Sequence, residues 1–270
     1  MPDAYVHGHA PHEIRRLHDQ ARTLADLIHA DTVYPVGHHV LEAGCGAGAQ
    51  TLELARRHPG TWFTAVDRVP DAVDRARHHA EAAGHANVSF RVADLDALPF
   101  TPARFDHVFV CFVLEHLPAP ARTLAALARL VRPGGTVTVV EGDHGTVCAH
   151  PDDPALHRAV ACQEALQRRA GGGPRIGRRL RPLLADAGLR DVHLALRPVC
   201  ADGGDPALAE AFTRRTFTAM VAGVRDEAVA AGLTTPADFD AGLRALHRTA
   251  EADGMFCYGF FKAVGTVPGP

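Results

Sequence analysis

The sequence predicts an α/β protein built on a largely parallel sheet. From residue 40 onward, short apolar runs alternate with helical stretches, and a glycine-rich turn follows the first of these runs. Parallel strands need crossover connections, which are usually helices, and their buried strands are short and apolar. The 270 residues suffice for one large domain of this class, or for one domain with a sizeable insertion.

The individual elements follow from this alternation. Apolar and β-branched runs predict strands, and proline or glycine marks where each helix begins or ends. The expected strands cover residues 40–42, 62–66, 88–92, 105–112, 136–140, 192–199 and 256–264. The expected helices cover residues 50–58, 70–83, 118–131, 154–170, 180–187, 206–231 and 236–250.

Two helical segments lie outside the alternation. Residues 1–36 carry part of a helical apolar stripe and are expected to form an N-terminal helical cap. Residues 202–252 interrupt the last pair of strands and are expected to form an inserted helical lid. The core would then comprise residues 37–201 and 253–270. Ligands bind at the carboxyl ends of the strands in such sheets, so we expect both segments to cover those ends.

Composition narrows the class of partner. The net charge is −3 with neutral histidines, whereas a nucleic-acid binder usually carries a basic excess. No apolar run approaches the ~20 residues that cross a bilayer, and the polar start lacks the apolar core of a signal peptide. We therefore expect a cytoplasmic protein with a small-molecule substrate, no nucleic-acid partner and no membrane partner. A homodimer is left open.

Cysteines and arginines give weaker signals. The six cysteines show no C-x-x-C spacing, and Cys111 and Cys257 lie in strand-like runs, where a free cysteine packs as a small apolar residue. Six arginines fall between residues 168 and 181. They indicate a solvated surface turn, with a clamp for an acidic group as the alternative.

The glycine-rich turn is the first candidate binding site. Gly44, Gly46 and Gly48 follow a strand and open a helix, whose free backbone N–H groups can face a ligand. Gly44, Gly46 and Ala49 also satisfy the G-x-G-x-x-A of dinucleotide-binding proteins, so the turn alone leaves the ligand open. Asp67, which ends the second strand, can hold two ribose hydroxyls in either case.

Further motifs separate these alternatives. Glu42 precedes the glycines, ADL (93–95) follows the third strand, FVLEHL (112–117) ends the fourth, and RPGG precedes the fifth. In this order the sequence resembles the class I S-adenosylmethionine-dependent methyltransferases over about residues 36–141. The resemblance implies a Rossmann-like fold with a seven-stranded, mostly parallel sheet whose last strand is antiparallel. It also implies S-adenosyl-L-methionine as the cofactor, with S-adenosyl-L-homocysteine as its product.

The resemblance assigns roles to the motif residues. The glycine loop would cradle the methionine end of the cofactor, Asp67 would bind the ribose, and Asp94 would bind the adenine amino group. Leu95 would flank the adenine ring. The cofactor contacts expected from these motifs and their immediate neighbours are Glu42, Gly44, Gly46, Gly48, Asp67, Arg68, Asp94, Leu95 and Phe112.

A finer resemblance points to small-molecule methyltransferases of actinobacterial natural-product pathways. It rests on Tyr5, on the helix with Gln20, on EGDHGT (141–146) and on the final GMFCYGFFKAVG. That group includes enzymes that methylate the indole C3 of tryptophan-derived diketopiperazines. It implies that Tyr5 and Gln20 close over the methionine portion of the cofactor. The alternatives are a terminal tail for Tyr5 and a solvated helix position for Gln20. The acceptor atom, whether carbon, nitrogen or oxygen, stays open.

Methyl transfer from a sulfonium depends mainly on alignment, and a base is needed only where the nucleophile must lose a proton. Three residues are candidate bases. His144 has Asp143 beside it, and a nearby carboxylate can fix the histidine tautomer and raise its basicity. Glu115 belongs to a step that is common in the superfamily and often structural. Tyr258 in the last strand is the third candidate.

The remaining expectations concern the substrate and alternative activities. Phe212, Phe217 and Met220 stand at near-helical spacing in the inserted segment, and with His116 they are expected to line a substrate pocket. No metal is predicted, although the acidic and histidine-rich stretch 141–153 leaves that question open. A nicotinamide-dependent oxidoreductase is disfavoured by the lack of a Tyr-x-x-x-Lys pair. A non-catalytic cofactor-binding protein is disfavoured by the intact motifs.

Overall fold

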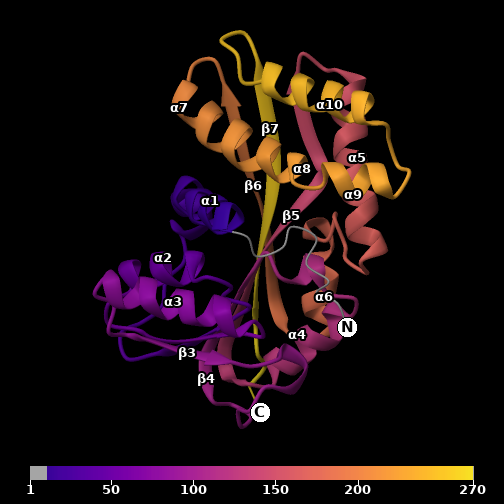
Figure 1. Cartoon of the computed structure of the whole chain (residues 1–270). Coiled ribbons are helices and arrows are strands. Elements are labelled where there is room, and N and C mark those ends of the chain that lie inside the picture. The colour runs from indigo at the N-terminus through magenta and orange to yellow at the C-terminus, as the bar shows by residue number, and fades with distance from the viewer. Residues whose placement is uncertain (1–10, 270) are drawn as a thin grey trace.

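The computed structural model describes residues 11–269, and it folds around one seven-stranded sheet (Figure 1). The strand order is β3-β2-β1-β4-β5-β7-β6. The first five strands pair in parallel, and β7 runs antiparallel to both of its neighbours. The predicted fold class is therefore confirmed. The strands are β1 (His39–Ala43), β2 (Trp62–Asp67), β3 (Val88–Val92), β4 (Phe105–Cys111), β5 (Val131–His150), β6 (Arg190–Asp202) and β7 (Met255–Thr266).

Helices cover both faces of the sheet because successive strand side chains point to opposite sides. On β1, Val40 packs in one core with Leu54, whereas Leu41 packs in the other with Leu124. The helices of the first core include α1 (Pro11–His29) and α2 (Ala49–Arg57), and those of the second are α4 (Pro120–Ala128) and α6 (Leu180–Asp186). Helix α3 (Pro70–Ala82) packs beside β2 and β3.

Strand β5 is much longer than the expected 136–140. It begins at Val131, which pairs with Phe105, and the pairing with β4 shifts before it resumes at Thr136. The Pro-Gly-Gly step thus forms an irregularity inside the strand, not its boundary. Beyond the parallel region β5 pairs with β7 alone, and the register shifts again between Asp143 and Cys148. Figure 1 shows β5, β6 and β7 continuing into a region where α5 (Pro154–Arg169) and the helices between β6 and β7 gather.

The segment between β6 and β7 differs from the expected single helix over 206–231. It forms α7 (Pro206–Leu208), a π-helix (Ala209–Thr218), α8 (Ala219–Ala222), α9 (Arg225–Ala230) and α10 (Pro236–Arg248). In the π-helix the Ala219 N–H bonds to the carbonyl of Arg214, five residues back, and the Thr216 hydroxyl bonds to the Ala211 carbonyl. Threonine hydroxyls compete for backbone carbonyls in this way. Such helices are rare and often lie at functional sites.

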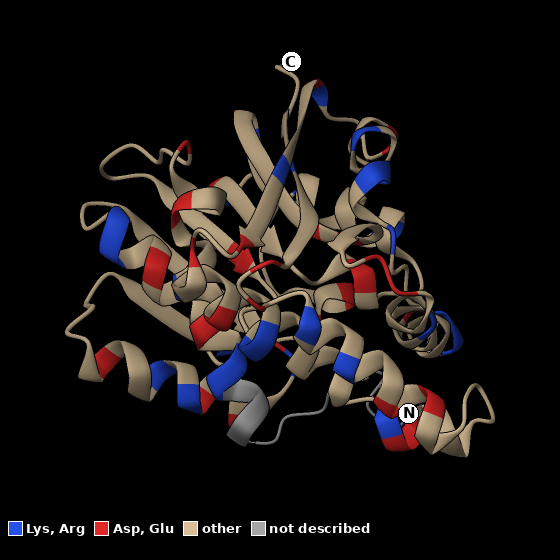
Figure 2. Ribbon diagram, turned by 90° about the horizontal axis from the view of Figure 1, so that it is seen from above, with Lys and Arg blue, Asp and Glu red and all other residues tan. Residues whose placement is uncertain are grey.

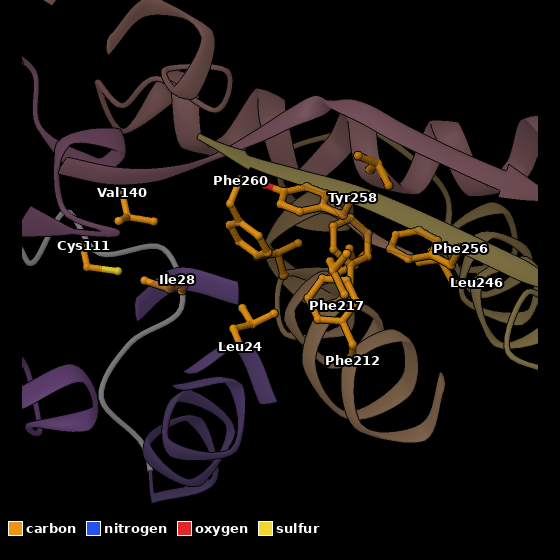
Figure 3. Packing of buried hydrophobic residues seen from close by; sticks show 14 of the residues in the cluster. Leu24, Ile28, Cys111, Val140, Phe212, Phe217, Leu246, Phe256, Tyr258 and Phe260 are labelled. Atoms are coloured by element: carbon orange, nitrogen blue, oxygen red, sulfur yellow. The ribbon is translucent and has the colours of Figure 1, made fainter. Parts of the chain in front are cut away.

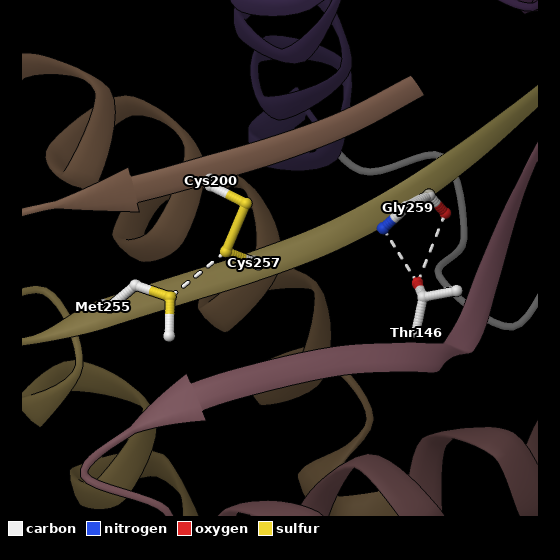
Figure 4. The surroundings of a disulfide bond; sticks show 5 residues. All are labelled: Thr146, Cys200, Met255, Cys257 and Gly259. Carbon is white, nitrogen blue, oxygen red and sulfur yellow. Dashed lines mark hydrogen bonds between the residues drawn. A yellow bond between two sulfur atoms is a disulfide. The ribbon is translucent and has the colours of Figure 1, made fainter. Parts of the chain in front are cut away.

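Two pairings tie distant strands and helices together. Cys257 forms a disulfide with Cys200, its in-register neighbour on β6 (Figure 4). The expectation of a free Cys257 is therefore wrong, because sequence spacing cannot show pairs brought together by strand register. Cys111 is free and buried, as expected. Lys262, buried on β7, donates hydrogen bonds to the Ile28 carbonyl and to Asp31 and so fixes the end of α1.

The charged residues are mixed in sign. Figure 2 shows acidic and basic residues interspersed along the helices in that view.

Among the described residues, no helix combines the length and the apolar character that a bilayer span requires.

Candidate functional site

A cavity of about 900 Å³ lies beyond the carboxyl ends of the parallel strands. Its walls come from the loops after β1 to β4, from β5 and β7, and from α1, α5 and the π-helix. The structure places all but one of the described candidate residues there. The candidates in its walls are Gln20, Glu42, Gly44, Gly46, Asp67, Arg68, Asp94, Leu95, Phe112, Glu115, His116, His144, Phe212, Phe217, Met220 and Tyr258. The exception is Gly48, and Tyr5 lies outside the described residues.

The glycine loop after β1 needs its glycines for different reasons. Gly44 has a φ of +82°, and a Cβ there would stand 2.5 Å from Val113 Cγ2. Gly46 has a φ of +51°, and its Cβ would meet no atom within 4 Å. A ligand can therefore approach the Gly46 backbone closely. Gly48 instead lets α2 approach Ala76 on α3, at 3.0 Å from its would-be Cβ.

Two carboxyl groups stand beside this loop. Asp67 accepts hydrogen bonds from the N–H of Gly46 at 2.9 Å and of Val69 at 3.0 Å. Glu42 is 2% exposed, and its Oε2 has no hydrogen-bond partner among the described residues. Burial, with a smaller contribution from the charge of Asp67, raises the pKa of Glu42 to about 7. A buried carboxyl oxygen without a partner indicates that a polar ligand group is needed there.

Another part of the cavity wall is formed by the turn after β3 and by α1. Asp94 caps a single 3₁₀ turn by accepting the N–H of Asp96 at 2.9 Å, and Leu95 begins that turn. On α1, Arg16 donates a hydrogen bond to Gln20 at 2.8 Å. Gln20 is thus a partly buried residue of the cavity wall, not a solvated position.

The loop after β4 is held by a buried glutamate. Glu141 on β5 accepts the N–H groups of Val113, Leu114 and Glu115 at 3.0, 2.7 and 3.3 Å. Phe112 takes a φ of +57°, an uncommon conformation for a bulky residue. Glu141 therefore positions the loop that presents Glu115 to the cavity.

His144 is held by Tyr258 and not by Asp143. The Nδ1 of His144 lies 3.2 Å from the Tyr258 hydroxyl, and its backbone N–H donates to the Pro174 carbonyl. Asp143 faces away and forms two charge-assisted hydrogen bonds with Arg178, at 2.6 and 2.7 Å. The expected Asp143–His144 pairing is therefore wrong. Burial lowers the pKa of His144, and burial raises that of Tyr258, so both are neutral near pH 7.

One part of the cavity wall is lined by aromatic rings. Phe212 and Phe217 of the π-helix face Tyr258 and Phe260 of β7 (Figure 3). The ring centroids of Phe217 and Tyr258 are 5.2 Å apart, within the usual range for packed aromatic pairs. Met220 completes this wall.

Sequence reasoning missed two glutamines on α5. Gln163 and Gln167 are 1% and 2% exposed and both line the cavity. Gln167 Nε2 donates to the backbone oxygen and to Oε2 of Glu115, at 3.2 and 3.3 Å. The i, i+4 spacing shows that the two side chains share a helix face. Nothing in the sequence shows that this face meets the cavity.

The basic stretch acts as a clamp, but on the protein's own carboxylates. Arg168 and Arg175 pair with Glu164, and Arg178 pairs with Asp143. Glu141 and Asp143 of the acidic stretch are thus engaged within the protein. Among the side chains that the structure describes, those of residues 15–269, no three of His, Cys, Asp or Glu are grouped to hold a metal ion.

Comparison with known proteins defines the first half of the site. Residues 40–135 match the model of a family described as a methyltransferase domain. This part of the chain is therefore similar to methyltransferase domains. The matched residues include Glu42, the glycine loop, Asp67, Asp94, Phe112 and the loop after β4 with Glu115 and His116. The parts of the wall from α1, α5, the π-helix, β7 and the end of β5 with His144 lie outside the matched residues.

Curated relatives match a stretch of about 100 residues of the chain. The ubiquinone biosynthesis O-methyltransferase of Paracidovorax citrulli is 39% identical over 102 residues, which cover 37% of this chain and 42% of the relative. The protein of the same name from Coxiella burnetii is 36% identical over 99 residues, which cover 37% of this chain and 41% of the relative. The chain thus matches about two fifths of the length of these relatives.

Solved structures extend the likeness of fold to nearly the whole chain. Phosphoethanolamine N-methyltransferase 2 of Haemonchus contortus gives a TM-score of 0.58 at 16% identity, over 93% of this chain and 53% of that one. YcgJ of Bacillus subtilis gives a TM-score of 0.59 at 16% identity, over 92% of this chain and 99% of that one. The [4+2]-cyclase SpnF gives a TM-score of 0.57 at 21% identity, over 93% of this chain and 82% of that one. A cyclase among these neighbours illustrates that the fold alone does not fix the reaction.

Proposed function

We propose that this chain is an S-adenosyl-L-methionine-dependent methyltransferase that acts on a small aromatic molecule. The observation that carries the proposal is the composition of the cavity. One side is the glycine loop and carboxylates of the methyltransferase domain, and the other is an aromatic wall from the π-helix and β7. The volume of about 900 Å³ is at the upper end of the range for ligand pockets, which suits a cofactor and a second molecule together.

The cofactor-side residues fit this cofactor. Glu42 offers a buried carboxyl oxygen that lacks a partner, and Gly46 offers open backbone. In the proposal these hold the amino-acid end of the cofactor. Asp67 would accept the ribose hydroxyls, and Asp94 would accept the adenine amino group beside Leu95. When bound, the cofactor supplies a methyl group activated by its positively charged sulfur.

The chain itself contributes alignment and exclusion of water. Holding two reactants in line supplies roughly 7–11 kcal/mol of the barrier reduction. In our proposal Phe212, Phe217 and Met220 hold the flat acceptor against the methyl group, with His116 at the same wall. Glu115 and His144 are the groups in reach of a departing proton, and Tyr258 orients the imidazole through its Nδ1.

Carbon C3 of an indole, as in a tryptophan-containing diketopiperazine, is our finer proposal for the acceptor. Attack from C3 places positive charge on the ring nitrogen, and loss of the N–H proton to a base relieves that charge. An aromatic hydroxyl is the second candidate. The name of the curated relatives, ubiquinone biosynthesis O-methyltransferase, favours it, and their match covers 37% of this chain.

The test is a direct assay of the purified protein. The chain is incubated with S-adenosyl-L-methionine and either a tryptophan-containing cyclic dipeptide or catechol. The products are separated by chromatography and identified by their masses in mass spectrometry. We expect S-adenosyl-L-homocysteine and one methylated acceptor. Nuclear magnetic resonance of that product then gives the methylated atom. Formation of no S-adenosyl-L-homocysteine above a no-enzyme blank with either acceptor would contradict the proposal.

Asp67→Ala should weaken S-adenosyl-L-methionine binding at least about tenfold in titration calorimetry. Hydrogen bonds to a charged acceptor contribute roughly 1.5–3 kcal/mol each, and the change also removes the partner of the Gly46 N–H. Asp74→Ala is the matched control, because Asp74 pairs on the surface with Arg77 and should leave the affinity unchanged. NADH should give no heat with the wild type. Equal cofactor affinity of the wild type and Asp67→Ala would refute the ribose assignment.

A further inference from the structure

Besides Glu42 Oε2, another acceptor atom in the cavity wall has no partner among the described residues. Gln167 on α5 is 2% exposed and lines the cavity, yet its Oε1 forms no hydrogen bond with any described residue. Buried polar atoms are almost always hydrogen-bonded, because an unpaired one loses its water without compensation. The position of this oxygen therefore indicates a donor that is supplied from outside the chain.

The orientation of the amide is fixed by its neighbours. Gln167 Nε2 lies 3.2 Å from the backbone oxygen of Glu115 and 3.3 Å from its Oε2, and both atoms only accept hydrogen bonds. The reverse orientation would set the amide oxygen against two oxygens. Gly173 donates to the same Glu115 carbonyl at 2.8 Å and so holds this carbonyl in place.

Gln167 stands on the substrate side of the cavity. Helix α5 follows β5 and lies outside the matched methyltransferase domain, and Gln167 contacts Glu115 instead of the glycine loop. The aromatic wall of Phe212, Phe217 and Tyr258 borders the same cavity. A molecule that packs its ring on this wall would present a polar edge to the Glu115–Gln167 pair.

Building on the proposed function, we infer that Gln167 Oε1 accepts a hydrogen bond from an N–H or O–H group of the methyl acceptor. Gln167 is thus a specificity-determining residue, and the substrate class is an aromatic molecule that carries a hydrogen-bond donor at its edge. A ring without that donor leaves the buried oxygen unpaired and is disfavoured. The aromatic wall provides affinity for the ring, and Gln167 determines which rings are retained.

The experiment compares ligands that differ only in the donor. The protein is loaded with S-adenosyl-L-homocysteine, and its affinities for indole and 1-methylindole, and for phenol and anisole, are measured by titration calorimetry. We expect the donor-bearing member of at least one pair to bind about tenfold more tightly or better. Gln167→Met, which removes the acceptor at similar length, should abolish this preference. Arg169→Met, on the exposed end of the same helix, leaves the Gln167 amide in place and should retain the preference.

Each outcome bears on the inference separately from the proposed function. Unchanged S-adenosyl-L-homocysteine affinity in both variants shows that they are folded. Equal affinity within both pairs in the wild type, including no measurable binding of any of the four, overturns the inference, as does a preference that survives in Gln167→Met. Methyl transfer to the preferred compounds is assayed in parallel with S-adenosyl-L-methionine. A donor preference that depends on Gln167, without any transfer, would leave the binding site intact and refute the methyltransferase proposal.

Discussion

His144→Ala should lower kcat by about 100-fold or more while the affinity for S-adenosyl-L-methionine stays nearly unchanged. A positioned base typically contributes about 10²–10⁴-fold where the acceptor must lose a proton. His144 lines the cavity, and its Nδ1 is engaged with the Tyr258 hydroxyl at 3.2 Å. A loss in kcat without a loss of cofactor binding identifies an interaction that is made in the transition state.

The direction in which the rate changes with pH also tests His144 as the base. A base works in its neutral form, and burial lowers the pKa of His144 below its ordinary value of about 6.5. The wild-type rate should therefore rise with pH through one ionisation below about pH 6.5 and be level above it. In His144→Ala this limb, the rise of the rate with pH, should be absent.

Two variants serve as controls for the assignment. Tyr258→Phe removes the hydroxyl that holds the imidazole and should give a smaller loss, with the limb retained. Glu115→Gln tests the rival base on the loop after β4. If the limb disappears in Glu115→Gln and persists in His144→Ala, Glu115 is the base. If neither change affects the rate, the chain works through alignment alone.

The cofactor side was predictable because it is encoded locally. Glu42 and Asp67 lie in the last two residues of their strands, and Gly46 and Asp94 follow within three residues of a strand. Parallel strands bring their carboxyl ends to one edge. Each residue could therefore be placed from its neighbours in sequence. Gly48 shows the limit of this reasoning, because a glycine in the same motif serves helix packing instead of the cavity.

The substrate side was less predictable because it depends on distant contacts. His144 and Tyr258 are 114 positions apart and meet only because β5 extends to His150 and pairs with β7. The sequence placed a carboxylate beside His144, but strand alternation sends the two side chains in different directions. Gln167 gave no signal at all, since its role follows from the contact of α5 with Glu115.

The arginine that engages Asp143 suggests a test of the loop that carries His144. Asp143 is fully buried and accepts from Arg178 Nε, Nη2 and backbone N–H, at 2.6, 2.7 and 3.3 Å. Arg178 belongs to the segment after α5, and Pro174 in the same segment accepts the His144 N–H. The ion pair thus connects the two segments that fix the position of His144.

Arg178→Ala should lower the free energy of unfolding by about 3 kcal/mol, because it leaves a buried carboxylate without its countercharge. The estimate is at the low end for buried pairs, since the Arg178 side chain is 48% exposed. Urea denaturation measures the loss, and kcat should fall with it as the His144 loop loosens. Adding Asp143→Asn should recover most of the stability, because the neutral amide no longer needs a cation. Arg181→Ala is the matched control, as Arg181 donates to the Val192 carbonyl at the surface. A loss below about 1 kcal/mol in Arg178→Ala, the range of exposed ion pairs, would show that this pair does not hold the loop.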